Sequence, residues 1–475
     1  MTPQPKHSNP VLAACLEELG WSPKSLARKL NKVFGPGTVA DSAPYHWRDH
    51  ARIPRSPLPM MTAYVLSQET GRVISVGELW QGRAPDSPML VPASGGLELP
   101  WTAQALWKIV EDWVLGGLVD RRQFLAISGS GLAAVVTDYL DGTAGRGSFL
   151  SQSPADTSEA FLLEQIDSQL PRLQALDDEH GGARHLGYIG AQFRSIALLL
   201  HEGGRSSAVT SRLLQALAEV GQLAGWMAFD ATHHGLAQRY FITALRAAHQ
   251  INDLPLCAHI LADMSFQAAS RDHPADAITL GEVARRAGDA APPAVRASVL
   301  SRLSFAYATA GRRTDFERSR TMARELVDQP PTGHEPRWMY FLTPNHLDCQ
   351  AGYALIHLGM SRNDDGTTAK ARTLLGQGIE LLQTGAHDRS QEAAHQRRAL
   401  YEGAWLALGN SARGELEAAC QVGETAAERL STVRSPRSTE LLRRLAVDLR
   451  RRQRNPYVRS FLPRLEHALQ ATNRS

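Results

Sequence analysis

The sequence predicts an all-α protein, with an N-terminal bundle of short helices followed by a C-terminal α-solenoid. Only 7% of the 475 residues are aromatic, while Ala and Leu recur throughout, a balance that favours helix over strand. From about residue 157 to the end, apolar residues follow helical spacing with short Gly, Pro or Asp/Asn breaks. Small and aromatic residues also recur there at intervals of about 40 residues, which indicates repeated helical hairpins.

Residues 1–82 have the pattern of a compact domain of short helices. A capping side chain followed by proline occurs at Asn9 and again at Ser22, and this order is typical of a helix start. A Gly-Pro-Gly turn then leads to a third predicted helix, which is expected to be capped near Asp41 or Ser42. Two helices joined by a turn in this way form the expected helix-turn-helix.

The third predicted helix combines one core residue with polar and basic neighbours. Trp47 is the expected core anchor because it is the largest apolar side chain of the segment. Ser42, Tyr45, His46 and Arg48 are then expected to face outward on its first turns, where a recognition helix contacts base edges.

Positive charge is concentrated around this helix. Residues 20–55 carry seven basic and two acidic side chains, a net charge of +5, whereas the whole chain carries only +3 from 51 Lys+Arg and 48 Asp+Glu. Basic side chains that flank a recognition helix fix it on the duplex through the phosphates. The sequence therefore predicts binding to double-stranded DNA, with the flanking contacts made by Lys24, Arg28, Lys29, Lys32, Arg52 and Arg55. A basic bundle that binds a protein partner is the alternative interpretation.

Residues 83–150 are predicted to be a linker that carries amphipathic helices. Four Pro and two Gly lie within 83–100, and helical apolar spacing resumes at Trp101. A second Gly-containing break occupies 141–148, and residues 151–475 form the predicted repeat domain.

The clearest copy of the repeat surrounds Phe241. Ala237, Phe241, Ala244 and Leu245 have the spacing of the second helix of a tetratricopeptide hairpin. Small residues let two antiparallel helices approach closely, while the aromatic ring fills the gap to the next hairpin. Stacked hairpins leave a concave groove that can hold an extended peptide or a partner helix. A generic helical bundle is the alternative.

Polar and aromatic side chains on the first helix of a hairpin are the candidates for binding an effector in such a groove. Amide side chains are suited to this role because they pair with a peptide backbone. The candidates are Tyr188, Gln192, Arg194, Asn345, His346 and Gln350. Each one taken singly is also consistent with a structural role.

The sequence contains no pattern that predicts catalysis, a cofactor or a metal site. It has neither an H-E-x-x-H motif nor a G-x-x-x-x-G-K-[ST] phosphate loop, and its four cysteines are scattered singly, as expected for buried thiols. It has no apolar stretch long enough to predict a membrane span and no N-terminal pattern of a secretory signal. We therefore expect a cytoplasmic, non-enzymatic protein that has no cofactor and does not bind a membrane.

A basic cluster lies near the C-terminus, on a helix with otherwise apolar periodicity. It consists of Arg450, Arg451, Arg452 and Arg454. The expected role is a solvated helix face, and the alternatives are a second phosphate-contacting patch or a surface that docks a partner.

Three segments together resemble a known family. They are W-S-P-x-x-L-A-R-x-L-N from Trp21, Y-H-W-R-D-H-A-R-I-P-R from Tyr45, and W-M-A-F-D-A-x-H-H-G-L-A-Q-R-Y-F from Trp226. These segments resemble actinobacterial helix-turn-helix/tetratricopeptide regulators, a group that includes regulators of sporulation and antibiotic production in streptomycetes. Its layout is similar to that of peptide-sensing regulators of Gram-positive bacteria.

The resemblance covers nearly the whole chain and implies a transcriptional regulator. It implies that Tyr45, Trp47 and Arg48 lie on the recognition helix. Our first hypothesis is a regulator whose repeat domain binds a peptide or protein effector or forms a homodimer. The turn before that helix is longer here than in compact phage-repressor domains. The competing hypothesis is a tetratricopeptide adaptor that binds protein partners and no DNA.

Overall fold

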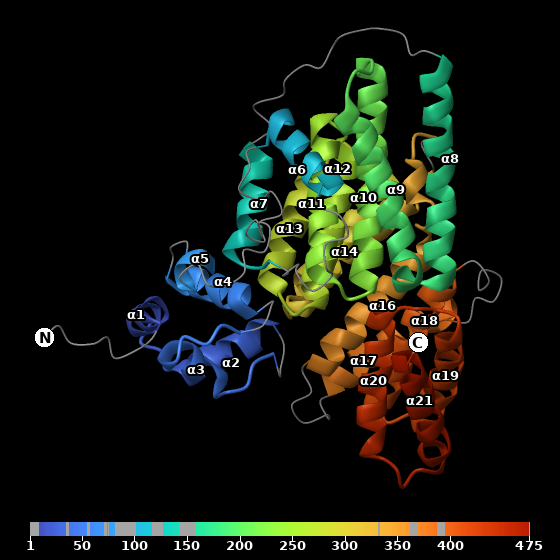
Figure 1. Ribbon diagram of the computed structural model, residues 1–475. Helices are drawn as coiled ribbons and strands as arrows, with labels where there is room; N and C mark the ends of the chain where they lie inside the picture. Colours follow the sequence, from blue (N-terminus) through green and yellow to red (C-terminus); the bar gives the residue numbers. More distant parts are fainter. Residues whose placement is uncertain are drawn as a thin grey trace, which may run out of the picture. The chain divides into compact units, whose positions relative to one another are not determined.

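All secondary structure in the described part of the chain is helical, which confirms the predicted all-α class (Figure 1). The computed structural model describes residues 9–34, 38–54, 58–70, 74, 76–80, 101–115, 127–141, 157–330, 333–361, 369–386 and 395–474. The chain divides into two compact units. Unit 1 comprises residues 1–95 and 119–125, and unit 2 comprises residues 96–118 and 126–475.

Unit 1 contains five helices in the described ranges. They are α1 (Pro10–Glu18), α2 (Pro23–Phe34), α3 (Ala43–Asp49), α4 (Leu58–Thr70) and α5 (Val76–Leu79). As predicted, α1 begins at a capping asparagine: Asn9 Oδ1 accepts a hydrogen bond from the Leu12 amide at 3.0 Å. The Asn9 backbone amide also donates to the carbonyl of Arg48 at 3.0 Å, so the start of α1 is joined to the end of α3.

The helices of unit 2 fall into two groups along the chain. The first group is α6 (Ala103–Leu115), α7 (Ser130–Asp141), α8 (Thr157–His180), α9 (Gly182–Glu202), α10 (Ser207–Asp230), α11 (His234–Gln250), α12 (Leu254–Ser270), α13 (Pro274–Ala287), α14 (Pro293–Thr309) and α15 (Arg313–Val327). The second group is the short 3-10 helix η3 (Arg337–Met339), α16 (Pro344–Ser361), α17 (Ala369–Ala386), α18 (Gln396–Arg413), α19 (Leu416–Glu428), the 3-10 helix η4 (Arg429–Ser431), α20 (Pro436–Arg450) and α21 (Pro456–Arg474).

Successive helices of unit 2 pack in pairs, and the first helix of each pair packs on the first helix of the next. The pairs begin with α10, α12, α14, α16, α18 and α20, and each of these helices contacts its successor in that series. This order is what a stack of helical hairpins requires. The tetratricopeptide identity of the hairpins stays a prediction.

The turns inside the hairpins repeat with the expected period. Thr232, Asp272 and Gly311 each have a positive φ, of 62°, 61° and 72°, at the turn between the two helices of a pair. These positions are 40 and 39 residues apart. The turns inside the hairpins thus keep the predicted interval of about 40 residues, and Asn252, with φ 60°, forms a left-handed turn between two hairpins.

Glycines permit the close helix approach that the repeat predicts. A Cβ atom at Gly225 on α10 would lie 2.6 Å from the Phe241 ring on α11, and one at Gly423 on α19 would lie 2.9 Å from the Phe461 ring on α21. Side chains at these positions would overlap the ring atoms. The aromatic rings therefore occupy the space that the missing side chains leave.

The segment 83–150 contributes α6 and α7 to the packing of unit 2. The Trp113 ring on α6 stacks on the Tyr240 ring at a centroid distance of 4.6 Å, and its Nε1–H donates to Thr243 Oγ1 at 3.0 Å. Before α7, the Gln238 amide makes two hydrogen bonds with the backbone of Ile127, at 2.7 and 2.9 Å. These two helices thus pack as part of unit 2, although the sequence predicts them within a linker.

Candidate functional site

The core of unit 1 fixes the orientation of α3. Trp47 is 3% exposed and packs edge-on against Trp80 at a centroid distance of 6.1 Å. With Trp47 turned inward, Tyr45 and His46 lie exposed on the same short helix, and Ser42 is exposed just before it. The outward placement of these three side chains agrees with the sequence-based expectation.

Arg48 is less available than its neighbours. Its guanidinium donates to both carboxylate oxygens of Asp49, at 2.7 and 3.0 Å, and lies 5.7 Å from the centre of the Tyr45 ring. The hydrogen bond to Asp49 raises the pKa of Arg48. To contact a base edge, the Arg48 side chain must exchange this partner for the base.

The flanking basic side chains differ in their partners. Lys24 pairs with Asp41 at 3.1 Å, and Lys29 pairs with Glu69 at 2.6 Å. Arg28 on α2 and Arg52 after α3 are exposed, and neither has a recorded ion pair among the described residues of unit 1. Arg28 and Arg52 are therefore the cations of this group best placed for phosphate.

The structure describes only part of one further predicted contact residue and none of another. Lys32 lies in α2 with its side chain outside the described residues, and Arg55 lies outside them altogether.

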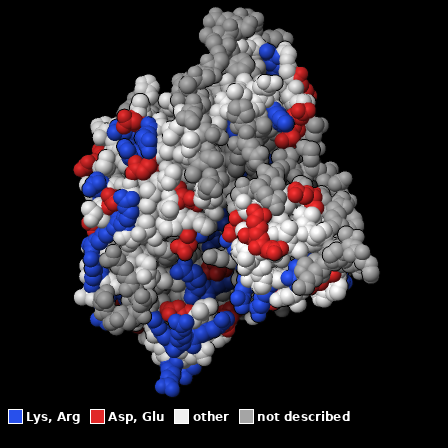
Figure 2. Space-filling model, turned by 90° about the vertical axis from the view of Figure 1, so that its left-hand side faces the viewer, with Lys and Arg blue, Asp and Glu red and all other residues white. Residues whose placement is uncertain are grey.

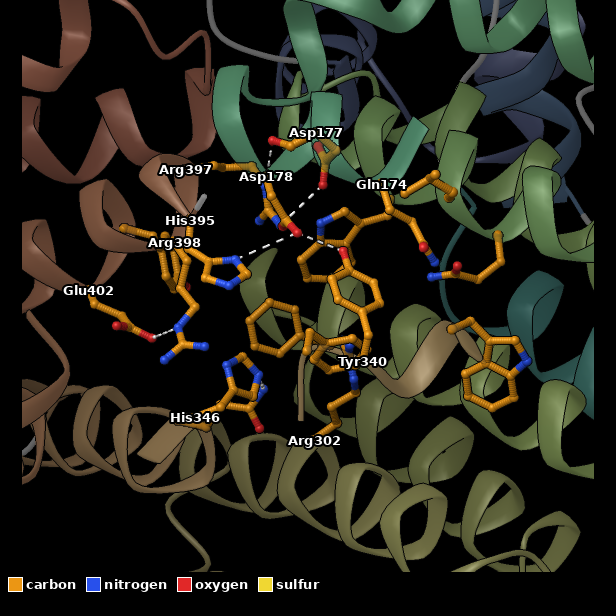
Figure 3. A pocket seen from close by; sticks show the side chains of 18 of the residues that line it. Gln174, Asp177, Asp178, Arg302, Tyr340, His346, His395, Arg397, Arg398 and Glu402 are labelled. Atoms are coloured by element: carbon orange, nitrogen blue, oxygen red, sulfur yellow. Dashed lines mark hydrogen bonds and ion pairs between the residues drawn. The ribbon is translucent and has the colours of Figure 1, made fainter. Parts of the chain in front are cut away.

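Unit 2 contains a pocket lined by charged and aromatic side chains, which the sequence analysis did not predict as a whole. Its cavity volume is about 100 Å³, and side chains from α8, α10, α12, α14, α16, α18 and α20 line it. Figure 3 shows three arginines, Arg302, Arg397 and Arg398, together with acidic side chains and His346 around one space. Helices far apart in the sequence thus meet at a single buried charge cluster.

One part of the cluster joins α8 to α18. Arg397 Nη2 lies 3.1 Å from a carboxylate oxygen of Asp177 and 3.1 Å from one of Asp178. Tyr340 donates its hydroxyl hydrogen to Asp178 at 2.7 Å, and His395 Nδ1 lies 3.6 Å from the same carboxylate. The second carboxylate oxygen of Asp177, Oδ1, is buried and has no hydrogen-bond partner in the described structure.

The pKa values of the two neighbouring carboxyl groups of α8 are shifted in opposite directions. Burial raises the pKa of Asp177 to about 7, against the opposing effect of Arg397. Burial acts on Asp178 as well, but the hydrogen bond with His395 and the charge of Arg397 outweigh it and lower the pKa of Asp178. Asp177 is therefore the carboxyl of this pair that changes its charge near neutral pH.

A second part of the cluster joins α12 to α14. Arg302 Nη1 forms an ion pair with Asp263 Oδ1 at 2.7 Å, and Gln222 donates a hydrogen bond to the other oxygen of Asp263 at 2.5 Å. His259 stacks on Trp338 at a centroid distance of 4.7 Å, and burial lowers the pKa of His259 to about 4. His259 is therefore a neutral, planar part of the pocket wall at pH 7.

The predicted effector residues divide between this pocket and other surfaces. His346 and Gln350 line the pocket, and their side-chain nitrogens are 2.8 Å apart. Asn345 lies on α16 without lining the pocket. Tyr188, Gln192 and Arg194 lie together on α9, where Tyr188 is 51% exposed, and they do not line it. The structure therefore brings two of the six candidates to one cavity.

Most residues of the pocket lie outside the sequence-based candidates. Arg302, which lines the pocket, and its ion-pair partner Asp263 were missed because the two residues lie on different helices. A signal was present for Asp263, because it is the one acidic or basic residue of α12 apart from His259, and a buried charge needs a partner.

Basic side chains also gather at the turn between α20 and α21. Figure 2 shows Lys and Arg at the lowest end of unit 2, where Figure 1 places this turn. Arg450 pairs with Glu466 at 2.7 Å and Arg452 with Asp448 at 3.4 Å, while Arg451 and Arg454 are exposed. Ion pairs thus cover part of the predicted basic cluster.

None of the described helices is both long enough and apolar enough to cross a membrane. Comparisons of the chain with protein families, with curated proteins and with solved structures found no match.

Proposed function

We propose that the chain is a DNA-binding transcriptional regulator in which unit 1 contacts the DNA and unit 2 binds an effector. The observation that carries the proposal is the orientation of α3. Trp47 is held in the core by Trp80, so Tyr45 and His46 face solvent, and the cations Arg28 and Arg52 of the same unit are also exposed. Aromatic and imidazole groups on a short helix can contact base edges, while flanking guanidiniums bind phosphates.

Unit 2 supplies the second half of this proposal. Its hairpin packing offers a surface for a peptide or protein partner, and its pocket offers a cavity for a ligand. Dimerisation through unit 2 would double the phosphate contacts and set the spacing between two half-sites.

Selection of DNA from a fragmented genomic library by the full-length chain tests the proposal. The bound fragments are sequenced after washing at two salt concentrations. A regulator enriches a short motif that persists at the higher salt, because base contacts survive when phosphate contacts weaken. Uniform recovery of fragments, from protein shown to be folded, would contradict the proposal.

A non-DNA-binding adaptor is the second candidate function. The observation that favours it is the neutralisation of Lys24, Lys29 and Arg48 by Asp41, Glu69 and Asp49, which reduces the positive charge of unit 1. An adaptor would show weak binding to any duplex, lost on modest addition of salt, and no motif.

A further inference from the structure

Two buried guanidinium nitrogens in the pocket of unit 2 have no hydrogen-bond partner in the described structure. Arg302 is 5% exposed and uses Nη1 for Asp263, and its buried Nε has no partner in the described structure. Arg437 uses Nε for Asp230, and its buried Nη1 likewise has no partner there. Two buried carboxylate oxygens of the same cluster, Asp177 Oδ1 and Asp263 Oδ1, also have no hydrogen bond in the described structure. Buried donors without partners are costly, so a ligand that brings acceptor oxygens is favoured.

Aromatic rings hold these guanidiniums in place. The guanidinium carbons of Arg302, Arg397 and Arg437 lie 5.1, 5.6 and 5.2 Å from the centre of the Trp226 ring. Arg437 also lies 4.2 Å from the centre of the Tyr401 ring. Stacking on aromatic faces fixes the plane of a guanidinium, which prepares it for a planar acceptor.

The size of the cavity limits the ligand. Its volume of about 100 Å³ is below the roughly 150 Å³ of an apolar cavity that holds one benzene molecule. A folded partner or a helix cannot enter such a space. The group that enters the cavity is therefore smaller than a benzene ring, such as a single carboxylate, and the rest of the ligand stays outside.

We propose that this pocket binds a small organic carboxylate, with its two oxygens placed on the guanidiniums of Arg302 and Arg437. A carboxylate is planar and presents two acceptors, which matches the fork of a guanidinium. The inference deepens the proposed function and rests on it for its biological meaning, because it gives the chemical class of the effector. Binding itself does not require that unit 1 binds DNA.

The charges of the site predict that a proton accompanies the ligand. Five carboxyl groups, those of Asp177, Asp178, Asp230, Asp263 and Glu402, accompany four guanidiniums, those of Arg302, Arg397, Arg398 and Arg437. Another anion is accommodated most readily if one carboxyl takes up a proton. Asp177 is the expected acceptor, since burial raises its pKa to about 7, with Asp178 and Asp230 raising it and Arg397 and Arg437 lowering it.

Calorimetric titration of the full-length chain, without DNA, tests the inference with two matched probes. Benzoate carries the carboxylate, and benzamide has nearly the same shape without the charge. We expect benzoate to bind at one site per chain, more tightly at pH 6 than at pH 8, with proton uptake at pH 8. Equal binding of benzamide, or no binding of benzoate, would overturn the inference, and neither result depends on whether the chain selects DNA.

The carboxylate can belong to a free acid or to the end of a peptide. The tripeptide Gly-Gly-Phe and its C-terminal amide separate these sources. Tighter binding of benzoate than of the tripeptide assigns the site to a free acid, and tighter binding of the tripeptide with no binding of its amide assigns it to a peptide end. Both results support a carboxylate site.

Variants of the chain locate the bound oxygens. Arg302→Lys keeps the charge but removes the planar fork, so we expect benzoate to bind about tenfold more weakly or worse. Arg454→Lys makes the same change at an exposed position outside the pocket and should leave the affinity unchanged. If Arg302→Lys binds benzoate like the parent, the assignment of Arg302 is wrong. If Arg302→Lys does not fold, the inference is tested by the difference in affinity of the parent chain for benzoate and for benzamide.

Discussion

Arg437 at the start of α20 donates Nε–H to Asp230 at the end of α10, at 3.2 Å, although 207 positions separate the two residues. Asp230 also accepts hydrogen bonds from Ser435 Oγ at 2.8 Å and from the Gly182 amide at 3.2 Å. Nearby, the Arg434 backbone amide donates to the His180 carbonyl at 2.7 Å. The buried carboxylate of Asp230 therefore links the last hairpin of unit 2 to its early helices through hydrogen bonds and an ion pair.

Removal of Arg437 is expected to weaken unit 2 strongly. Arg437→Ala leaves Asp230 buried without its ion-pair partner, and such a change costs about 3–5 kcal/mol of unfolding free energy. The measurement is chemical denaturation followed by circular dichroism. Arg443→Ala is the control, because Arg443 pairs with Glu440 at the surface, where loss of a pair costs about 0–1 kcal/mol. Equal effects of the two variants would show that the buried pair has no special role.

The stability of unit 2 should depend on the charge of Asp177. Its pKa in the folded chain is about 7, above the ordinary value of 3.8, so protonation of Asp177 stabilises the folded state. This contribution is complete below about pH 4 and is lost as the pH rises through 7. Asp177→Asn carries no ionisable group, so its stability relative to the parent should rise by about 1 kcal/mol per pH unit between roughly pH 5 and 7.

The same denaturation experiment, at several pH values, checks the Asp177 prediction. His259 and His234 have pKa values lowered to about 4 and about 3 by burial, so they change stability in the opposite direction, but they are present in both chains and cancel. A difference between variant and parent that does not change with pH would contradict the raised pKa of Asp177.

Replacement by alanine should change the stability of the folded chain in opposite directions at two glycines of neighbouring helices. Gly225→Ala on α10 places a Cβ atom 2.6 Å from the Phe241 ring and is expected to cost about 1–3 kcal/mol through overpacking. Gly187→Ala on α9 meets no atom within 4 Å and should stabilise the helix by about 0.5–1 kcal/mol. The melting temperatures of the two variants test the hairpin packing. A loss at Gly187 or a gain at Gly225 would contradict it.

Particular residues show why the sequence predicts some of this and not the rest. Trp47 is predictable as a core residue, because one large apolar side chain stands among polar ones on a short helix. The all-α class and the repeat interval follow from local spacing in the same way. The pairing of Arg437 with Asp230 is not predictable, because it depends on how far the successive hairpins rotate before the chain returns to α10.

The candidate site residues were likewise only partly predictable from the sequence. His346 and Gln350 were predicted from their residue type and they line the pocket, but nothing local distinguishes them from Tyr188 or Arg194, which do not. The pairing of Arg48 with the adjacent Asp49 was also missed, because spacing alone does not indicate whether two neighbouring side chains turn toward each other.

Substitution of the two aromatic residues of α3 should affect folding in one case and DNA binding in the other. Trp47→Ala empties the core beside Trp80 and is expected to cost about 3–5 kcal/mol of stability. Tyr45→Ala alters a side chain that is 40% exposed, so stability should change by about 0.5 kcal/mol or less while preference for the selected DNA motif falls. Unchanged motif preference in folded Tyr45→Ala protein would show that α3 does not contact the bases.

The most direct test of the account is a titration of the full-length chain with two duplexes of equal length, one carrying the selected motif and one with that motif scrambled. Fluorescence anisotropy at several salt concentrations gives both affinities. We predict a preference for the motif of about 10³ or more that persists as salt weakens the binding of both duplexes. Equal affinity for the two duplexes at every salt concentration would contradict sequence-specific DNA binding, and with it the central claim that the chain is a transcriptional regulator.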